Sequence, residues 1–366
     1  MTSAARVEAR LPPGFWPAVY NVTMGGEWPP QTRASTDLFI KRCAWHRLLP
    51  LLSVEADTLP GFAHAIGSVR MLDRAFAVES ARRYAAVTTV CGIFQDEPII
   101  LLKGADYGAR LYSQAHLRPI GDIDILVRAD RFDAVCERGL RSGFVPVAKA
   151  VQGTMLSPTH NEREYEFDGQ IVDLHQSFVH VPRHRIDYDG IWRRRVPTNS
   201  GCDHVARLEA VDALVYHALT MGFDDFRLRL IRFVDFWLLL NQYEGIASVA
   251  AARARDWQAA RALFGALSLA CRLFPAFRTA DVIGAMEHLV SRFERRLVER
   301  WILPVAADLR KSSPPNRSLQ LWRKTFLLDS WARRLAFAAH YISQAAYPWA
   351  ARSSGDARVG EEESRR

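Results

Sequence analysis

Two aspartates separated by a single residue, Asp122 and Asp124, are the residues of this sequence best suited to chemistry. They stand in the segment GDIDILV, which is typical of a buried strand, and side chains two positions apart on a strand share one face. Adjacent carboxylates repel each other unless a cation lies between them, and a hard ion such as Mg²⁺ or Mn²⁺ suits that position. The alternative is a solvated strand end at which both carboxylates face water.

A third carboxylate, Asp173, follows Asp124 at a distance of 173 − 124 = 49 positions in the segment QIVDLH. An Asp-Gly turn before this segment predicts a hairpin whose second strand carries Asp173 and His175 on one face. If that strand lies beside the first, three carboxylates converge, as two-metal phosphoryl or nucleotidyl transfer requires. His175 would contact phosphate or support Asp173, and a structural or solvated histidine is the alternative.

A phosphate-binding turn is predicted at Lys103-Gly104, directly after the apolar strand at residues 99–102. Glycine allows a ligand to approach the backbone closely, and the helix expected at 105–114 would direct its N-terminal amides and positive dipole at a phosphate. Lys103 adds a point charge. The alternative is a solvated lysine beside a glycine that the turn conformation requires.

The elements that position these residues predict an α+β fold, a small mixed sheet flanked by helical regions. The strand at 121–127 is followed by a helix at 131–141 with Asp130 as its N-cap and Gly143 after its end. Amphipathic or apolar periodicity predicts further helices, among them 61–89 and 228–240. The expected organisation is an extended arm at 1–33, an N-terminal helical region at 34–92, the core at 93–200, a C-terminal helical region at 201–350 and a disordered tail at 351–366.

Composition limits the remaining classes of function. The 366 residues contain no run of 18 apolar residues and no signal-peptide pattern at the N-terminus, so we expect a cytoplasmic protein without membrane insertion. The net charge of +8 comes from scattered arginines, which suits nucleotide phosphates but does not indicate a nucleic-acid-binding protein. Five widely spaced cysteines without a Cys-x-x-Cys motif argue against disulfides and a thiolate zinc site.

Two other groups of residues have simpler interpretations than catalysis. His175, His180 and His184 are spaced like zinc ligands, but they lie on a strand end and a proline-containing loop, and no cysteine accompanies them. Asp235 lies within a very apolar predicted helix, three residues after Arg232. We expect Asp235 to form an ion pair within or between helices.

Several motifs in order resemble the uncharacterised nucleotidyltransferase family, a branch of the polymerase-β-like nucleotidyltransferase superfamily. The resemblance extends over roughly residues 35 to 260. It is carried by the following segments: Leu101-Leu102-Lys103-Gly104, Arg118-Pro119, Gly121-Asp122-Ile123-Asp124-Ile125-Leu126-Val127, Ser142-Gly143-Phe144, Val172-Asp173-Leu174-His175, Trp45-His46-Arg47-Leu48-Leu49-Pro50-Leu51-Leu52, Ile191-Trp192, His217 and Arg232-Phe233-Val234-Asp235.

The resemblance implies that Asp122 and Asp124 are the metal-binding pair and Asp173 is the third carboxylate. Lys103-Gly104 stands where the superfamily usually has Gly-Ser, so the turn lacks a hydroxyl donor. Arg118 would reach the triphosphate or pin the loop before the strand. Family members are similar to proteins found near peptide-modification and polysaccharide gene sets, which implies a peptide, sugar or small-molecule acceptor and biosynthetic partner enzymes.

Three functions therefore compete. The first is a Mg²⁺- or Mn²⁺-dependent nucleotidyltransferase that moves a nucleoside monophosphate from an NTP to an unidentified acceptor. The second is an accessory protein that keeps the fold without catalysis, and the third is a phosphotransferase using the same site. Three mutually repelling acids favour the first, because a protein without the activity has no reason to keep them together.

Overall fold

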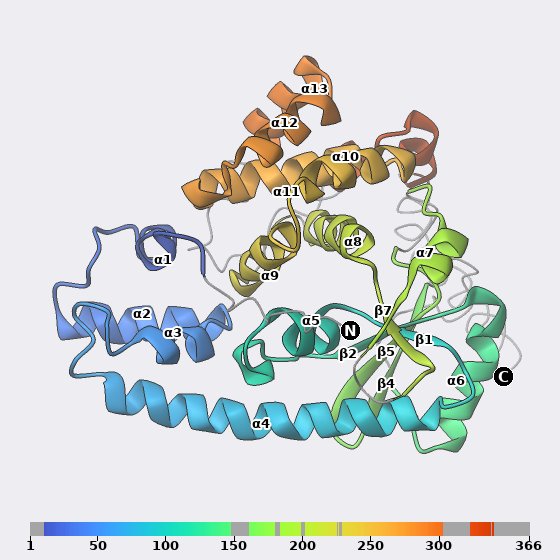
Figure 1. Cartoon of the computed structure of the whole chain (residues 1–366), viewed down its shortest axis with the longest axis horizontal. Coiled ribbons are helices and arrows are strands. Elements are labelled where there is room, and N and C mark those ends of the chain that lie inside the picture. The colour runs from blue at the N-terminus through green and yellow to red at the C-terminus, as the bar shows by residue number, and fades with distance from the viewer. Residues whose placement is uncertain are drawn as a thin grey trace, which may run out of the picture.

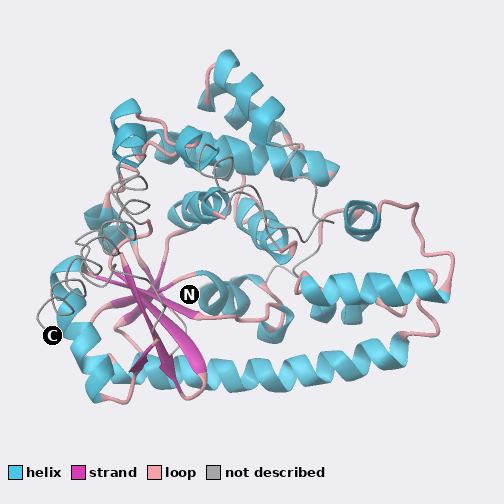
Figure 2. Cartoon of the chain, turned by 180° about the vertical axis from the view of Figure 1, so that it is seen from behind, coloured by secondary structure: helices cyan, strands magenta, loops and turns pink. Residues whose placement is uncertain are grey.

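The computed structural model describes residues 11–147, 161–179, 184–198, 202–224, 226, 229–302, 323–337 and 339. A seven-stranded mixed sheet lies toward one end of the molecule, and helices from both halves of the chain surround it (Figure 1). Seen from behind, the strands gather at one place while the rest of the described chain is almost entirely helical (Figure 2). The α+β class with a flanked mixed-sheet core, predicted from the sequence, is confirmed.

Four helices precede the sheet in the chain: α1 (Phe15–Met24), α2 (Arg33–Trp45), α3 (Leu49–Glu55) and α4 (Ile66–Ile93). Helix α4 runs along one side of the whole molecule, beneath α2, α3 and the sheet (Figure 1). Helices α5 (Lys103–Leu111), α6 (Phe132–Arg141) and α7 (Tyr188–Arg194) alternate with the strands. The later helices are α8 (Ala210–Phe223), α9 (Ile231–Leu240), α10 (Ile246–Asp256), α11 (Ala260–Leu273), α12 (Ala280–Leu289) and α13 (Arg292–Leu297).

The strand order across the sheet is β3-β4-β5-β2-β1-β7-β6. The central strand β2 (Ile123–Val127) is parallel to β5 (Gln170–His175) and antiparallel to β1 (Ile99–Leu101). The outer strands are β3 (Val145–Pro146), β4 (Glu162–Phe167), β6 (Val196–Pro197) and β7 (Val205–Arg207). The predicted hairpin is confirmed, because β4 pairs with β5 across Asp168 and Gly169, which both have positive φ.

Side-chain alternation gives the sheet two different faces. One face packs against the C-terminal part of α4 and against α6, through residues such as Val90, Ile123, Ile125 and Val135. The other face belongs to a second, larger core that includes α5, α8 and the N-terminal helices. Asp124 lies on this second face, since it alternates with Ile123 and Ile125, so the site faces α5 and α8.

Several boundaries differ from the sequence-based prediction. The expected extended arm contains α1, which forms because Phe15, Trp16, Val19 and Tyr20 bury one helical face. Asp130 does not cap α6, since a short 3₁₀ turn precedes the helix and Arg131 occupies the N-cap position. The expected disordered tail at 351–366 lies outside the described residues. Within the described part of the chain, no helix is long and apolar enough to cross a membrane.

Candidate active site

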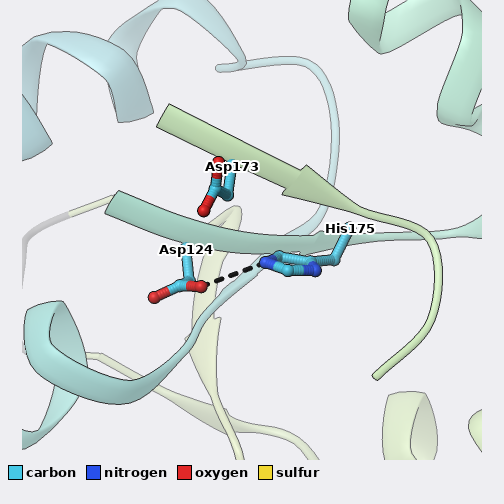
Figure 3. Close-up of side chains that lie close together, drawn as sticks. All are labelled: Asp124, Asp173 and His175. Atoms are coloured by element: carbon cyan, nitrogen blue, oxygen red, sulfur yellow. Dashed lines mark hydrogen bonds and ion pairs between the residues drawn. The ribbon is translucent and has the colours of Figure 1, made fainter. Parts of the chain in front are cut away.

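The parallel pairing of β2 with β5 brings two of the three predicted acids, Asp124 and Asp173, together. Asp124 on β2 lies directly beside Asp173 on β5 in the register of the two strands. His175, two residues further along β5, projects from the same face and directs its ring at Asp124 (Figure 3). Metal-ligating atoms of Asp124, Asp173 and His175 all lie within 4.8 Å of one another. The predicted convergence of the two strands is therefore present in the fold.

The two oxygens of the Asp124 carboxylate have different surroundings. Oδ1 accepts hydrogen bonds from Lys103 Nζ at 2.6 Å and from His175 Nε2 at 3.0 Å. Oδ2 is buried and has no hydrogen-bond partner within the described structure, and the same holds for Oδ1 of Asp173. Buried polar atoms without partners are uncommon, because each one loses its solvation without compensation.

These two buried oxygens fit a divalent cation. A hard ion prefers carboxylate oxygens, and an ion between Asp124 and Asp173 would supply the partner that both atoms lack. Since the Nε2–H of His175 is directed at Oδ1 of Asp124, the histidine orients that carboxylate and leaves Oδ2 available. The residues present therefore suit a divalent cation.

The carboxylates of Asp124 and Asp173 have different pKa values. Burial alone would raise the pKa of Asp124, but the charge of Lys103 and the hydrogen bond from His175 outweigh it and hold the pKa below its usual value. Burial raises the pKa of Asp173 to about 7, and the neighbouring charge of Asp124 contributes to the increase. In the metal-free protein Asp124 is ionised, whereas Asp173 exchanges a proton near neutral pH.

Asp122 occupies a different environment from the other two acids. It precedes β2 and is exposed, and it does not belong to the group of ligating atoms formed by Asp124, Asp173 and His175. Its carboxylate lines the adjacent cavity, and the charge of Asp124, followed by desolvation, raises its pKa. Asp122 is thus close enough to Asp124 for that charge to raise its pKa, although Asp122 remains exposed to solvent.

Lys103 is the first residue of α5 and has the left-handed backbone angle φ = 45°. This conformation is unfavourable for a residue with a side chain, and such strain is concentrated at functional sites. Its ammonium group contacts Asp124, and although burial lowers the pKa of Lys103, the charge of Asp124 outweighs this and keeps the pKa well above its usual value. Lys103 therefore serves first as the counterion of the buried carboxylate.

Gly104 is buried in the first turn of α5. A Cβ atom at this position would lie 3.4 Å from Nη1 of Arg118 and 3.7 Å from Cα of Ile120. Both are ordinary van der Waals distances, so the loop before β2 lies close to the start of the helix without requiring a glycine there. Gly104 and Lys103 also line the cavity, so the turn at which phosphate binding was predicted is accessible from the cavity.

Arg118 is held almost entirely by protein groups. Its Nε and Nη2 donate to the carboxylate of Asp235 at 2.8–2.9 Å, and its Nη1 donates to the carbonyl of Pro119 at 2.7 Å. Tyr112 donates a further hydrogen bond to Asp235 at 2.8 Å. These contacts favour the alternative in which Arg118 pins the loop. Asp235 does form an ion pair, but its partner is Arg118 in the loop before β2 rather than a residue of the same or another helix, while Arg232 pairs with Asp224.

A cavity of about 480 Å³ opens beside the carboxylates. Its walls come from the α2–α3 connection, the start of α5, the loop before β2, the end of β5, and helices α8 and α9. They include the predicted residues Lys103, Gly104, Arg118, Asp122 and His175. The aromatic ring of Tyr216 and the neutral ring of His217, whose pKa burial lowers to about 3, line the side formed by α8.

Glu162 and Arg47 are among the wall residues that were not predicted as site residues from the sequence. Glu162 pairs directly with His175 across β4 and β5, and its Oε2 lies 3.3 Å from Nδ1 of the imidazole. Arg47 reaches the cavity from the α2–α3 connection. Its guanidinium contacts Gly121, which lies 121 − 47 = 74 positions later in the sequence. Hairpin register could have indicated Glu162, whereas Arg47 stood in the resembling segment at residues 45–52 without a role assigned to it.

The three histidines considered as zinc ligands have different positions. His175 contacts Asp124, while Nδ1 of His184 lies 2.8 Å from the carbonyl of Gln258. His180 lies outside the described residues. All five cysteines are free, as expected, and four of them are buried.

The chain belongs to a nucleotidyltransferase family. The model of the uncharacterised nucleotidyltransferase family matches residues 32–275, which is more than half of the 366 residues. The match confirms the resemblance seen in the sequence, and it contains all predicted site residues as well as Arg47 and Asp235. No curated protein and no solved structure matches the chain.

Proposed function

We propose that this protein transfers a nucleoside monophosphate from an NTP to an acceptor, with Mg²⁺ or Mn²⁺ held by Asp122, Asp124 and Asp173. The observation that carries the proposal is the pair of buried, unpartnered oxygens on Asp124 and Asp173, which lie side by side on β2 and β5. Family membership supports the same class of reaction. Peptides, sugars and small molecules remain the candidate acceptors, and biosynthetic enzymes the candidate partners.

In the proposed reaction, an acceptor oxygen attacks the α-phosphorus of the NTP. The new oxygen–phosphorus bond forms as the bond to the β-phosphate oxygen breaks, and pyrophosphate leaves. Asp173 stands beside Asp124 and accepts the acceptor's proton or contributes to the ion site, while His175 and Lys103 orient Asp124. A bound divalent ion would neutralise the charge that develops on the phosphates.

Transfer of label from NTP tests the proposal. The protein is incubated with Mg²⁺, a cell-extract fraction and each α-labelled NTP, and the labelled product and pyrophosphate are measured. We expect Asp124→Asn and Asp173→Asn each to lower the rate at least about a hundredfold, the scale for losing one group that stabilises transition-state charge. Unchanged transfer by either variant would contradict the assignment.

Asp133→Asn is the matched control, because Asp133 is an exposed carboxylate on α6 that pairs with Arg163 outside the cavity. Circular dichroism of all variants would show whether the fold is retained. Release of nucleoside diphosphate in place of pyrophosphate would indicate a phosphotransferase.

One contact favours a second candidate, an accessory protein without catalysis. The Lys103 ammonium already lies 2.6 Å from Asp124 and balances its charge. If the Lys103 ammonium takes the place of the metal ion, calorimetry will detect no binding of Mg²⁺, and no binding of any NTP when Mg²⁺ is present. Binding of both would reject this candidate.

A further inference from the structure

Several of the charged side chains around the cavity are paired with one another. Lys103 pairs with Asp124, Arg118 with Asp235, and Arg232 with Asp224. Two further cations on the wall, Arg47 and Arg229, form no ion pair among the residues described. Asp122 and Glu162 also line this wall, so within the described part of the chain Arg47 and Arg229 present guanidinium groups without an ion pair rather than a net positive charge.

A backbone connection holds these two arginines near each other. His46 accepts a hydrogen bond from the backbone N–H of Leu230 through its Nδ1 at 3.2 Å, and its carbonyl accepts another from the N–H of Ile231 at 3.3 Å. Because burial, aided by Arg42 and Arg229, lowers the pKa of His46 to about 4, the ring is neutral and Nδ1 remains an acceptor. The α2–α3 connection is thus joined to the start of α9, one residue from each arginine.

Arg47 is also placed with some strain. Its backbone has the left-handed angle φ = 59°, and its guanidinium lies so close to Gly121 that a Cβ there would be 2.6 Å from both terminal nitrogens. Burial and the charges of Arg229 and Arg118 lower the pKa of Arg47 to about 10, so it remains charged at neutral pH. The nearby charge of Asp122 raises the pKa of Arg47 and offsets part of this effect, but Arg47 forms no ion pair among the described residues, so its guanidinium donors can bind a further anion.

We infer that Arg47 and Arg229 form an anion site on the cavity wall that binds the polyphosphate chain of the nucleotide. The inference rests on the proposed function for the identity of the nucleotide, but the anion site itself does not depend on catalysis. The guanidinium of Arg47, next to Gly121 before β2, would hold phosphate oxygens close to the carboxylates. This assignment gives Arg47 and Arg229 the role that the sequence had suggested for Arg118.

Binding of inorganic tripolyphosphate tests the inference without requiring turnover. Calorimetry in Mg²⁺ would compare the wild type with Arg47→Gln, Arg229→Gln and Arg70→Gln. Arg70 is the control, because it pairs with Asp57 outside the cavity. We expect the Kd to rise about tenfold or more in each of the first two variants, the scale of one charge-assisted hydrogen bond, and to stay unchanged in the control.

Gly121→Ala provides a second test that keeps both charges. The added methyl group would displace the flexible end of Arg47, so tripolyphosphate should again bind more weakly while the melting temperature changes little. This variant decides the matter if Arg47→Gln fails to fold.

Wild-type affinity in Arg47→Gln and Arg229→Gln, or no tripolyphosphate binding by the wild type, would overturn the anion site. Neither result would by itself exclude label transfer from NTP. Conversely, arginine-dependent tripolyphosphate binding without label transfer would support the anion site and contradict the proposed reaction.

Discussion

At the scale of single residues, the site combines two carboxylates whose protonation differs. Asp124 is fully buried but ionised, because Lys103 and His175 both donate to one of its oxygens. Asp173 has no such donor on its buried oxygen and therefore takes up a proton near neutral pH. A divalent ion would remove this difference by holding both carboxylates ionised.

The first prediction concerns Asp173 and pH. Its pKa is raised from 3.8 to about 7, so the folded metal-free protein retains a proton that the unfolded chain releases. Stability should therefore fall as pH rises from about 4 to about 7. Because asparagine cannot ionise, Asp173→Asn should be more stable than the wild type by roughly 4 kcal/mol at pH 8 and similar to it near pH 4.

Urea unfolding in EDTA at both pH values would measure this difference. Asp133→Asn, an exposed carboxylate variant, should show no such pH dependence. A wild type as stable as Asp173→Asn at pH 8 would mean that Asp173 is not destabilised by its surroundings.

Lys103 gives the second prediction. Lys103→Met leaves the buried Asp124 carboxylate without its cation, so the metal-free protein should lose about 3 kcal/mol of stability. Mg²⁺ should then raise the melting temperature of the variant more than that of the wild type, because the ion replaces the lost charge. Equal shifts in the two proteins would argue that no ion binds at Asp124, and Lys41→Met, an exposed lysine variant, is the control.

At the scale of elements, the site depends on connections between segments far apart in the sequence. The parallel β2–β5 pairing aligns Asp124 with Asp173, and the Arg118–Asp235 ion pair joins the loop before β2 to α9. The hydrogen bonds of His46 connect the α2–α3 turn to the same helix. Helix α9 thus helps to position both the carboxylate strand and the cavity wall.

Disruption of the Arg118–Asp235 pair should cost far more stability than disruption of an exposed pair. Asp235→Asn leaves a buried guanidinium without its carboxylate, for which we expect a loss of about 3–5 kcal/mol. Asp224→Asn breaks the pair with Arg232 at an exposed carboxylate and should cost no more than about 1 kcal/mol. Urea unfolding compares the two, and equal losses would contradict the proposed role of the buried pair.

Local patterns predicted much of this element arrangement. Period-two alternation placed Asp173 and His175 on one face, and the Asp-Gly turn identified the β4–β5 hairpin. The partners of Lys103 and Arg118 could not be predicted in the same way. Lys103 and Asp124 are 21 positions apart in the sequence, and Arg118 and Asp235 are 117 positions apart. Such contacts depend on how whole helices pack, and a single sequence carries no local signal for them.

At the scale of the whole molecule, the N-terminal and C-terminal helical regions share one hydrophobic core. The rings of Phe15 on α1 and Phe274 after α11 stack with their centroids 5.4 Å apart. The arm expected at 1–33 therefore contributes to the packing of the last helices, which periodicity alone did not reveal. This shared core lies on the side of the sheet that carries Asp124.

We therefore expect Phe15→Ala to lower the free energy of unfolding of the whole protein, which should still unfold in a single transition. Removal of this buried ring should cost about 3–5 kcal/mol, while Phe293→Ala, at a ring that is 70% exposed, should change stability by no more than about 0.5 kcal/mol. Urea unfolding followed by circular dichroism and by tryptophan fluorescence should give coincident transitions. Separate transitions would indicate that the N-terminal helices unfold independently of the rest.

The binding of Mn²⁺, measured by the loss of the free-ion electron paramagnetic resonance signal, shows whether Asp124 and Asp173 hold a metal ion. We expect the wild type to bind Mn²⁺ and Asp124→Asn and Asp173→Asn each to abolish this binding, whereas Asp133→Asn should not. A wild type that leaves the free-ion signal unchanged, or site variants that bind as well as the wild type, would contradict a metal-dependent nucleotidyltransferase built on these two carboxylates.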